Sequence, residues 1–194
     1  MKIPSNAAAL IVLAAMVFGM SPVQAEESWT PPGPAVGERF PSTLNLPDQA
    51  GVGRDLASLQ GKNGVVLVFV RSADWCPICM RQLADLNARL SRFEALGLAV
   101  VSVSVDPVAD LARFHSEQKI GYTMVADTKG TVVQALGIRD PAYGPDSRAF
   151  GVPQPVIFVL DRKQIVRAKF AEHGYRNRPD LDRVLEQLAG LDLG

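Results

Sequence analysis

The sequence has few of the residues that usually bind metals or crosslink a chain: two cysteines and two histidines among 194 residues. A structural zinc site usually needs four ligands, and His115 and His173 each stand alone, so such a site is disfavoured. The two cysteines, Cys76 and Cys79, are separated by only two residues. A bridge over so short a loop removes little chain entropy, so a purely structural role for this pair is disfavoured as well.

The sequence also lacks net charge and has no basic block. Twenty Lys and Arg residues balance twenty Asp and Glu residues. Nucleic acids and anionic membrane surfaces attract proteins mainly through concentrated positive charge. The composition therefore predicts neither of them as a partner.

Near the N-terminus, the apolar run from 7 to 20 is shorter than the roughly 20 residues of a membrane-spanning helix. It follows Lys2 and precedes Val23-Gln24-Ala25, a small-residue segment of the kind that signal peptidase cleaves. We therefore expect a signal peptide over 1–25, cleaved after Ala25, and a periplasmic or otherwise exported protein without stable membrane insertion. The alternative is an uncleaved membrane anchor.

The remaining length suits a single domain. Residues 26–34 are polar and proline-rich, which predicts a flexible or extended lead-in. We expect one folded domain over 35–192, since no repeat or composition shift marks a boundary inside it.

The two cysteines lie between a strand pattern and a helix pattern. The run Val65–Val70 is apolar and β-branched, as expected for a buried strand. After it, apolar residues recur at helix spacing: Cys79, Leu83, Leu86, Leu90 and Phe93. Cys76 would thus stand at a helix start, where free backbone N–H groups and the helix dipole favour the reactive thiolate. Pro77 would fall in the first helical turn, where its missing N–H costs nothing.

Other segments alternate between strand and helix patterns, which predicts an α/β domain. Strands are predicted over 40–46, 98–105, 122–126, 155–160 and 165–170, the last two as an antiparallel hairpin; helices are predicted over 77–96, 108–118, 131–136 and 179–188. Asp106 is a candidate N-cap for the second of these helices. The loop 139–154 has no periodic pattern, and loops of that length are often functional.

A buried strand that ends in Trp75-Cys76-Pro77-Ile78-Cys79, and a proline, Pro155, that leads directly into a later strand, carry a family resemblance. Over about 34–190 the chain resembles the thioredoxin superfamily, in particular the exported redoxins related to the alkyl hydroperoxide reductase and thiol-specific antioxidant (AhpC/TSA) group. The resemblance implies a thioredoxin-like fold, with a central mixed β-sheet flanked by helices on both faces. It also implies a cis peptide bond before Pro155, which would pack against the dithiol; Pro153 is the competing candidate.

Two carboxylates of the resembled proteins are absent here. Thioredoxins carry an acid six positions before the first cysteine, where this chain has Val70. Exported reductases of the group often carry a glutamate six positions after it, where this chain has Gln82. Either carboxylate would accept the proton of the buried second thiol. Asp74 and Asp85 are substitutes, although aspartate is more often solvated than buried.

A peroxiredoxin-type peroxidase is the rival interpretation within the same fold. Such enzymes resemble the pattern Pro-x-x-x-Thr-x-x-Cys, and neither Cys76 nor Cys79 fits it; the residue three positions before Cys76 is Ala73. These peroxidases also place an arginine at the start of the later strand, where this chain has Pro155, although Arg148 in the adjacent loop could supply a guanidinium. The missing groups favour thiol–disulfide exchange over peroxide reduction.

We therefore predict an exported thiol–disulfide oxidoreductase that acts on the thiols and disulfides of client proteins. Cys76, which we expect to be partly exposed, would form a mixed disulfide with the client, and Cys79 would resolve it. The redox-active disulfide would be the whole redox centre, with no further cofactor and no metal. Electrons would come from a membrane thiol transporter or a thioredoxin-like donor, as the resemblance implies.

Further site residues are assigned around the dithiol. Pro155 would shield it and present backbone to the substrate, and Pro77 and Ile78 would tune its reduction potential. Trp75, Asp74 and Gln154 are predicted substrate contacts. A third hypothesis is a non-catalytic or copper-handling module on the same scaffold, which the isolated histidines disfavour.

Overall fold

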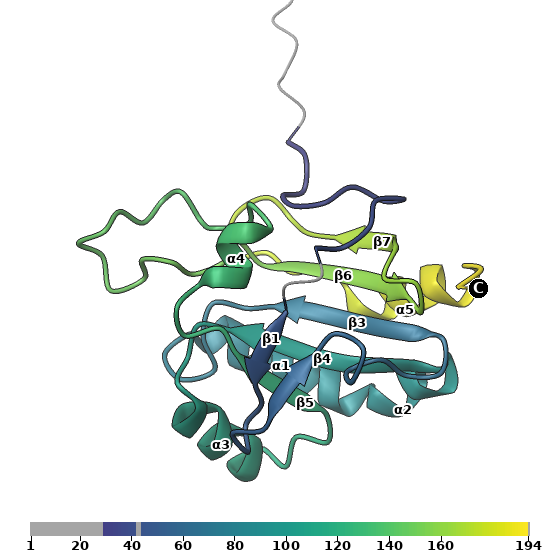
Figure 1. Cartoon of the computed structure of the whole chain (residues 1–194), viewed down its shortest axis with the longest axis horizontal. Coiled ribbons are helices and arrows are strands. Elements are labelled where there is room, and N and C mark those ends of the chain that lie inside the picture. Colours follow the sequence, from purple (N-terminus) through teal and green to yellow (C-terminus); the bar gives the residue numbers. More distant parts are fainter. Residues whose placement is uncertain (1–28, 42–43, 194) are drawn as a thin grey trace, which may run out of the picture.

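A five-stranded mixed sheet forms the centre of the computed structural model, which describes residues 29–41 and 44–193 (Figure 1). The predicted signal peptide over 1–25 lies outside the described residues. The strands stand in the order β5-β4-β3-β6-β7. Their bounds are β3 Gly64–Phe69, β4 Leu98–Ser104, β5 Thr123–Ala126, β6 Val156–Asp161 and β7 Val166–Phe170.

The central strand is β3. It pairs in parallel with β4 on one edge and antiparallel with β6 on the other, and all of its residues are buried. Alternate side chains point to opposite faces, so Val66 and Val68 enter one apolar cluster while Val65 and Leu67 enter a second one. The predicted burial on both faces is thereby confirmed. The predicted hairpin is confirmed too, since β6 and β7 pair antiparallel.

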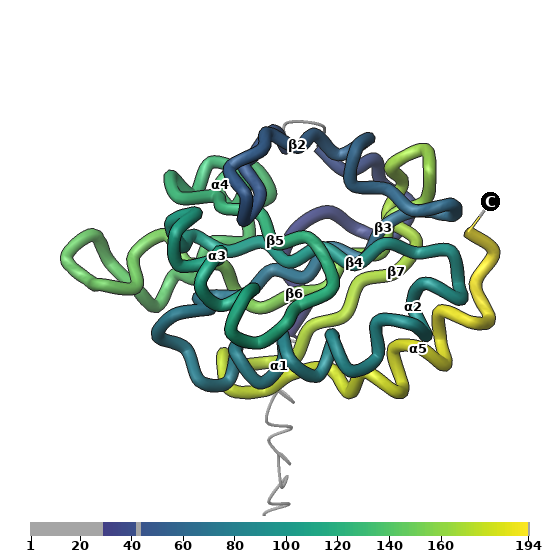
Figure 2. The backbone as a smooth tube through the Cα atoms, turned by 90° about the horizontal axis from the view of Figure 1, so that it is seen from below, coloured from purple at the N-terminus to yellow at the C-terminus, as the bar shows by residue number. Residues whose placement is uncertain are grey.

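Helices cover both faces of the sheet. Their bounds are α1 Pro77–Ala88, α2 Leu90–Ala95, α3 Val108–Glu117, α4 Thr131–Ala135 and α5 Leu181–Ala189. Figure 2 shows α1, α2 and α5 along one face, while α4 lies on the opposite side of the sheet. A short hairpin of β1 (Asn45–Pro47) and β2 (Gly53–Asp55) lies on the same side as α4. The predicted α/β architecture is thus confirmed.

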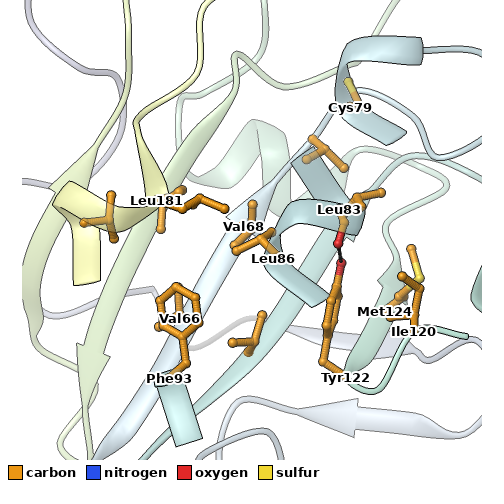
Figure 3. Packing of buried hydrophobic residues seen from close by; sticks show 14 of the residues in the cluster. Val66, Val68, Cys79, Leu83, Leu86, Phe93, Ile120, Tyr122, Met124 and Leu181 are labelled. Carbon is orange, nitrogen blue, oxygen red and sulfur yellow. Dashed lines mark hydrogen bonds between the residues drawn. The ribbon is translucent and has the colours of Figure 1, made fainter. Parts of the chain in front are cut away.

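The cluster beneath α1 links the helix to the sheet and contains one of the two cysteines. In Figure 3, Cys79, Leu83 and Leu86 lie in a row along the buried side of α1. The Tyr122 hydroxyl donates a hydrogen bond of 2.9 Å to the Leu83 carbonyl. Burial raises the pKa of Tyr122, so the phenol stays a neutral donor at ordinary pH. Cys79 is therefore part of a fully buried region of the core.

The predicted single helix after the cysteines is in fact two helices that meet at Arg89. The Arg89 N–H bonds the carbonyl of Leu86, while the carbonyl of Asp85 accepts from the Arg89 guanidinium. The same guanidinium also bonds Asp182 of α5. The side chain thus replaces the regular backbone bond at this turn. The predicted end at Gly97 is confirmed, because Gly97 follows α2 with a φ of +73°.

No helix within 29–41 and 44–193 is long and apolar enough to cross a bilayer. The described part of the predicted lead-in, from residue 29 onward, runs beside β7. There Lys169 donates to the carbonyls of Pro31 (2.9 Å) and Gly33 (3.2 Å).

A buried carboxylate closes the β6–β7 hairpin. Asp161 accepts hydrogen bonds from the N–H groups of Lys163 and Ile165 and from the guanidinium of Arg167. Burial acts to raise the pKa of Asp161, but these bonds and the Arg167 charge lower it overall.

Asp161→Asn is expected to lower the free energy of unfolding at pH 7 by about 1–3 kcal/mol, because the turn loses a charged acceptor. A carboxyl with a lowered folded pKa stabilises fully above its unfolded pKa of about 3.9. That contribution is lost as the pH falls through the lower folded pKa, so the difference should shrink at pH 3. Urea unfolding at both pH values measures it, with exposed Glu186→Gln as the control. A difference that is independent of pH would contradict the assignment.

Candidate active site

Cys76 and Cys79 form a disulfide at the start of α1, with a Cα–Cα distance of 5.2 Å. Cys76 is the N-cap of the helix, and its sulfur accepts a hydrogen bond of 3.3 Å from the Cys79 N–H. Pro77 occupies the first turn. The predicted placement of the dithiol between a buried strand and a helix N-terminus is confirmed, so a Cys76 thiolate would meet backbone donors and the helix dipole.

The exposure of Cys76 differs from the prediction. We expected it to be partly exposed, but Cys76 is only 6% exposed and Cys79 is fully buried. Cys76 belongs to the same apolar cluster as Leu83, and half-buried Trp75 packs against that cluster beside it. A partner can therefore reach only the small exposed part of Cys76.

A buried carboxylate holds the loop that leads into the dithiol. Asp106, at the end of β4, accepts from the hydroxyl of Ser72 (2.6 Å), the N–H of Ala73 (2.7 Å) and the hydroxyl of Ser104 (2.7 Å). The oxygen of the Ser72 hydroxyl also accepts hydrogen bonds from the N–H groups of Asp74 and Trp75. Asp106 is therefore not the predicted N-cap of α3. That position belongs to Pro107, because the Asp106 side chain turns back toward the dithiol loop.

A buried arginine lies directly before this loop. Arg71 is 4% exposed and forms no ion pair with any described residue, and its Nε has no hydrogen-bond partner there. Its guanidinium instead lies against three aromatic rings, at 5.4 Å from Trp75, 4.7 Å from Tyr143 and 4.5 Å from Tyr175. Cation–π contacts of this kind are worth about 0.5–2 kcal/mol each when desolvated. A positive charge is thus buried next to Trp75.

A second arginine reaches the buried cysteine from the loop between β7 and α5. Arg178 Nη2 lies 3.4 Å from Cys79 Sγ, and Arg178 Nε donates to Gln82 Oε1 at 2.7 Å. Burial, followed by the nearby charge of Arg71, lowers the pKa of Arg178 to about 10. The guanidinium therefore remains charged at neutral pH.

The long loop 139–154, for which its length suggested a functional role, borders the dithiol region. Tyr143 covers Arg71, and the Arg148 guanidinium lies 6.0 Å from the centre of the Trp75 ring. Beside it is a cavity of about 430 Å³. Its lining includes Asp74, Trp75, Asp106, Lys129, Arg148 and Phe150.

The structure separates the predicted contact residues into two groups. Trp75 and Asp74 line the cavity just described, and Asp74 also pairs with Arg113 at 2.7 Å. Gln154 and Pro155 line another cavity of about 390 Å³, with Trp29, His173 and Tyr175. Tyr175 touches Arg71, which connects the second cavity to the dithiol loop.

The predicted cis bond is wrong. None of the described peptide bonds is cis, so the bonds before Pro155 and Pro153 are trans. The trans form is the lower in energy for most X–Pro bonds, and Pro155 at the entrance of β6 loses no ladder hydrogen bond in this form. Pro155 stays next to the dithiol loop in the sheet, because the following residue, Val156, pairs with Phe69 at the end of β3.

The carboxylates considered as proton acceptors do not reach the buried thiol. Asp85 is exposed, and Asp74 is exposed and paired with Arg113. Gln82 is 5% exposed and binds Arg178.

Among the described residues, no three His, Cys, Asp or Glu side chains gather to hold a metal ion.

A family model described as the AhpC/TSA family matches residues 36–169. The chain belongs to the AhpC/TSA family. It is 26% identical to the chloroplastic peroxiredoxin Q of Suaeda salsa over 78% of this chain and 67% of that protein. It is 31% identical to a peroxiredoxin of Aeropyrum pernix over 83% of this chain and 64% of that protein. For a peroxiredoxin of Pyrococcus furiosus, the chain spans only 61% of the relative's length.

Solved structures confirm the thioredoxin-like fold. The peroxidoxin BcpB of Mycobacterium tuberculosis superposes with a TM-score of 0.68 at 24% identity, covering 81% of this chain and 97% of that chain. Peroxiredoxin Q of Xanthomonas campestris superposes with a TM-score of 0.66 at 21% identity, covering 79% of this chain and 96% of that one. At these identities the likeness is one of fold.

Sequence reasoning missed both arginines and the two tyrosines that contact Arg71. Arg71 was visible as the charged residue that directly follows a buried strand and precedes the Cys-x-x-Cys motif. Arg178, Tyr143 and Tyr175 carried no comparable signal, because their loops reach the dithiol only in the folded chain.

Asp106→Ala is expected to lower the free energy of unfolding by about 1–3 kcal/mol, since buried donors of Ser72 and Ala73 lose their acceptor. The Ala73 amide should also exchange with deuterium faster than in the parent protein. Urea unfolding and hydrogen exchange measure the two effects. The control is Asp110→Ala, which removes an ion pair at the surface of α3. Equal effects of the two substitutions would contradict the anchoring role.

Proposed function

We propose that the chain is an exported thiol–disulfide oxidoreductase that exchanges electrons with client proteins through Cys76 and Cys79. The observation that carries the proposal is the disulfide within the first turn of α1. With both sulfurs in one helical turn, the dithiol/disulfide cycle needs no second chain and no distant cysteine. The family assignment supports cysteine-based redox chemistry.

In the reducing direction, the Cys76 thiolate attacks one sulfur of a client disulfide. A mixed disulfide forms with Cys76, and the other client sulfur leaves as a thiolate that takes a proton from water. Cys79 then attacks Cys76 Sγ, and the second client sulfur leaves in the same way. The client gains two electrons and two protons, and the protein keeps the Cys76–Cys79 disulfide. The reverse sequence oxidises a client dithiol.

The surroundings of the dithiol support specific roles. Trp75 and Asp74 would contact the client in the cavity beside the long loop, and Gln154 and Pro155 would contact it at the start of β6. Pro77 is exposed and Ile78 is half-buried, so both stand where they would alter the reduction potential by changing the surroundings of Cys76. The potential and the electron partner, a membrane thiol transporter or a thioredoxin-like protein, set the direction of transfer.

Peroxide reduction at Cys76 is the second candidate, and two observations favour it. The relatives named above are peroxiredoxins, and one guanidinium group, that of Arg178, contacts Cys79 while another, that of Arg71, lies against Trp75. Against it, Ala73 offers no hydroxyl three residues before Cys76, and the Ser72 hydroxyl is bonded to Asp106. Exchange therefore remains the first proposal.

Trapping with single-cysteine variants tests the proposal. Cys79→Ala should accumulate disulfide-linked complexes through Cys76, because the resolving thiol is missing, whereas Cys76→Ala should form none. Non-reducing electrophoresis followed by mass spectrometry measures both. Complexes that form through Cys79 in Cys76→Ala, and none in Cys79→Ala, would contradict the assigned roles.

Addition of hydrogen peroxide distinguishes the two candidates. If exchange is the function, the reduced protein should consume hydrogen peroxide no faster than a small free thiol does at the same pH. A rapid loss of one equivalent, with a sulfenic acid on Cys76 in Cys79→Ala, would instead establish the peroxidase.

A further inference from the structure

A cation is held against the buried sulfur of the pair and has no anion as its partner. The Arg178 guanidinium bonds Cys79 Sγ, Gln82 Oε1 and the backbone carbonyls of Tyr175 and Asn177. All of these acceptors are neutral while the disulfide is formed. Arg178 forms no ion pair with any residue in the described part of the chain.

The charged groups around Arg178 do not neutralise it. Arg71 adds a second positive charge from the loop before α1. The neighbouring cavity, of about 340 Å³, has two acidic residues in its lining, Asp85 from α1 and Asp180 from the start of α5. Asp85 is exposed, and Asp180 accepts from the N–H groups that open α5. The other charged residues of that lining are Arg81, Arg89 and Arg176.

A half-buried cation is costly unless an anion compensates it. The disulfide sulfur of Cys79 is a weak neutral acceptor, so the oxidised protein does not provide that anion. The reduced or half-reacted protein does, because there the Cys79 sulfur can ionise 3.4 Å from Arg178 Nη2. An opposite charge at that distance favours the charged form of an acid, whereas burial alone would oppose it.

We propose that Arg178 stabilises the Cys79 thiolate as an ion pair, in place of the proton-accepting carboxylate of the resembled proteins. Arg178 acts on a reacting atom, and Gln82 is a positioning residue that holds the guanidinium. The role of the ion pair in catalysis rests on the exchange function proposed above. The formation of the ion pair does not depend on that function.

In the mixed disulfide, Cys79 releases its proton to water in the adjoining cavity, which Ile78, Gln82 and Arg178 line. The thiolate attacks Cys76 Sγ, the Cys76–Cys79 bond forms, and the client sulfur leaves with the electron pair of the broken bond. Charge moves from Cys79 to the leaving sulfur, and Arg178 returns to facing a neutral disulfide.

A substitution at position 82 distinguishes the ion-pair mechanism from a mechanism in which a carboxylate is the general base. With Gln82→Glu, a general-base mechanism predicts faster deprotonation of Cys79. The ion-pair mechanism predicts the opposite, because a glutamate bonded to Arg178 would neutralise the cation and repel the thiolate.

The test is the pH titration of the Cys79 thiolate by its absorbance near 240 nm. It is done in the Cys76→Ser background, since two neighbouring thiols would titrate as a coupled pair. Arg178→Met should raise the apparent pKa of Cys79 by about one unit or more. Arg178→Lys should restore part of the shift, and Gln82→Glu should raise the pKa as well.

Arg176→Met is the matched control, because Arg176 lines the same cavity but is exposed and has no bond to Cys79. Its titration should equal that of the parent. An unchanged pKa in Arg178→Met, or a lowered one in Gln82→Glu, would overturn the proposal. If Arg178→Met does not fold, as judged by circular dichroism, Arg178→Gln replaces it in the same titration, and a pKa equal to that of the parent would overturn the proposal, because Gln82→Glu raises the pKa partly by its own charge.

A rate measurement links the ion pair to exchange. With Cys76 intact and oxidised glutathione as substrate, Arg178→Met should slow resolution by roughly tenfold at pH 7, and the loss should fade as the pH rises. If no protein variant reacts with disulfides while the titrations behave as expected, the exchange function fails and the ion pair stands. If exchange is normal and the titrations do not shift, only the ion pair fails.

Discussion

Burial of β3 on both faces and both edges is the constraint from which the rest of the structure follows. A strand in that position is buried along its whole length, and the chain reaches the helix that covers one face through a short loop after the strand. The dithiol lies where that loop enters the helix. Cys76 thus gains the free N–H groups of α1, while Cys79, one turn later, faces the apolar cluster that α1 shares with the sheet. The difference between the two sulfurs comes from their positions on one helix.

The loop between β3 and α1 needs support beyond its own backbone, and the neighbouring strand supplies it. Asp106 at the end of β4 fixes Ser72 and Ala73, so parallel pairing of β3 and β4 brings a buried acceptor to the start of the motif. Two further charged groups around the dithiol are positive. Arg71 and Arg178 contribute positive charge, and Gln82 stands where a carboxylate would have cancelled it. A site of this kind favours sulfur anions, whether the oxidant is a disulfide or a peroxide.

Much of the fold could be predicted from local patterns. The strands β3, β4 and β6 are apolar runs between turn residues, and α5 shows helical periodicity, so each was found within a few residues. For α1 only the start was found, because the same periodicity continues into α2. The break at Arg89 could not be found, because neither proline nor glycine marks it and its cause is a side-chain bond to the carbonyl of Asp85. The N-cap assigned to Asp106 failed since Asp-Pro has the same local appearance whether the carboxylate faces forward or back. The bond before Pro155 had no local signal at all, and the resemblance alone implied cis. The cysteines, Pro77 and Trp75 were visible as a motif, but Arg178 enters the site from a loop distant in sequence.

The aromatic surroundings of Arg71 have a consequence for how the chain can vary. Tyr143 and Tyr175 come from two separate loops, and both rings rest on the same guanidinium beside Trp75. Surface loops commonly accept insertions and deletions, because their length changes stability only slowly. Here each loop has to place its tyrosine ring against the Arg71 guanidinium. A change of length in either loop would therefore displace a neighbour of the dithiol. The lengths of these two loops are therefore constrained by the dithiol site, although loop length is ordinarily the property of a domain that varies most easily.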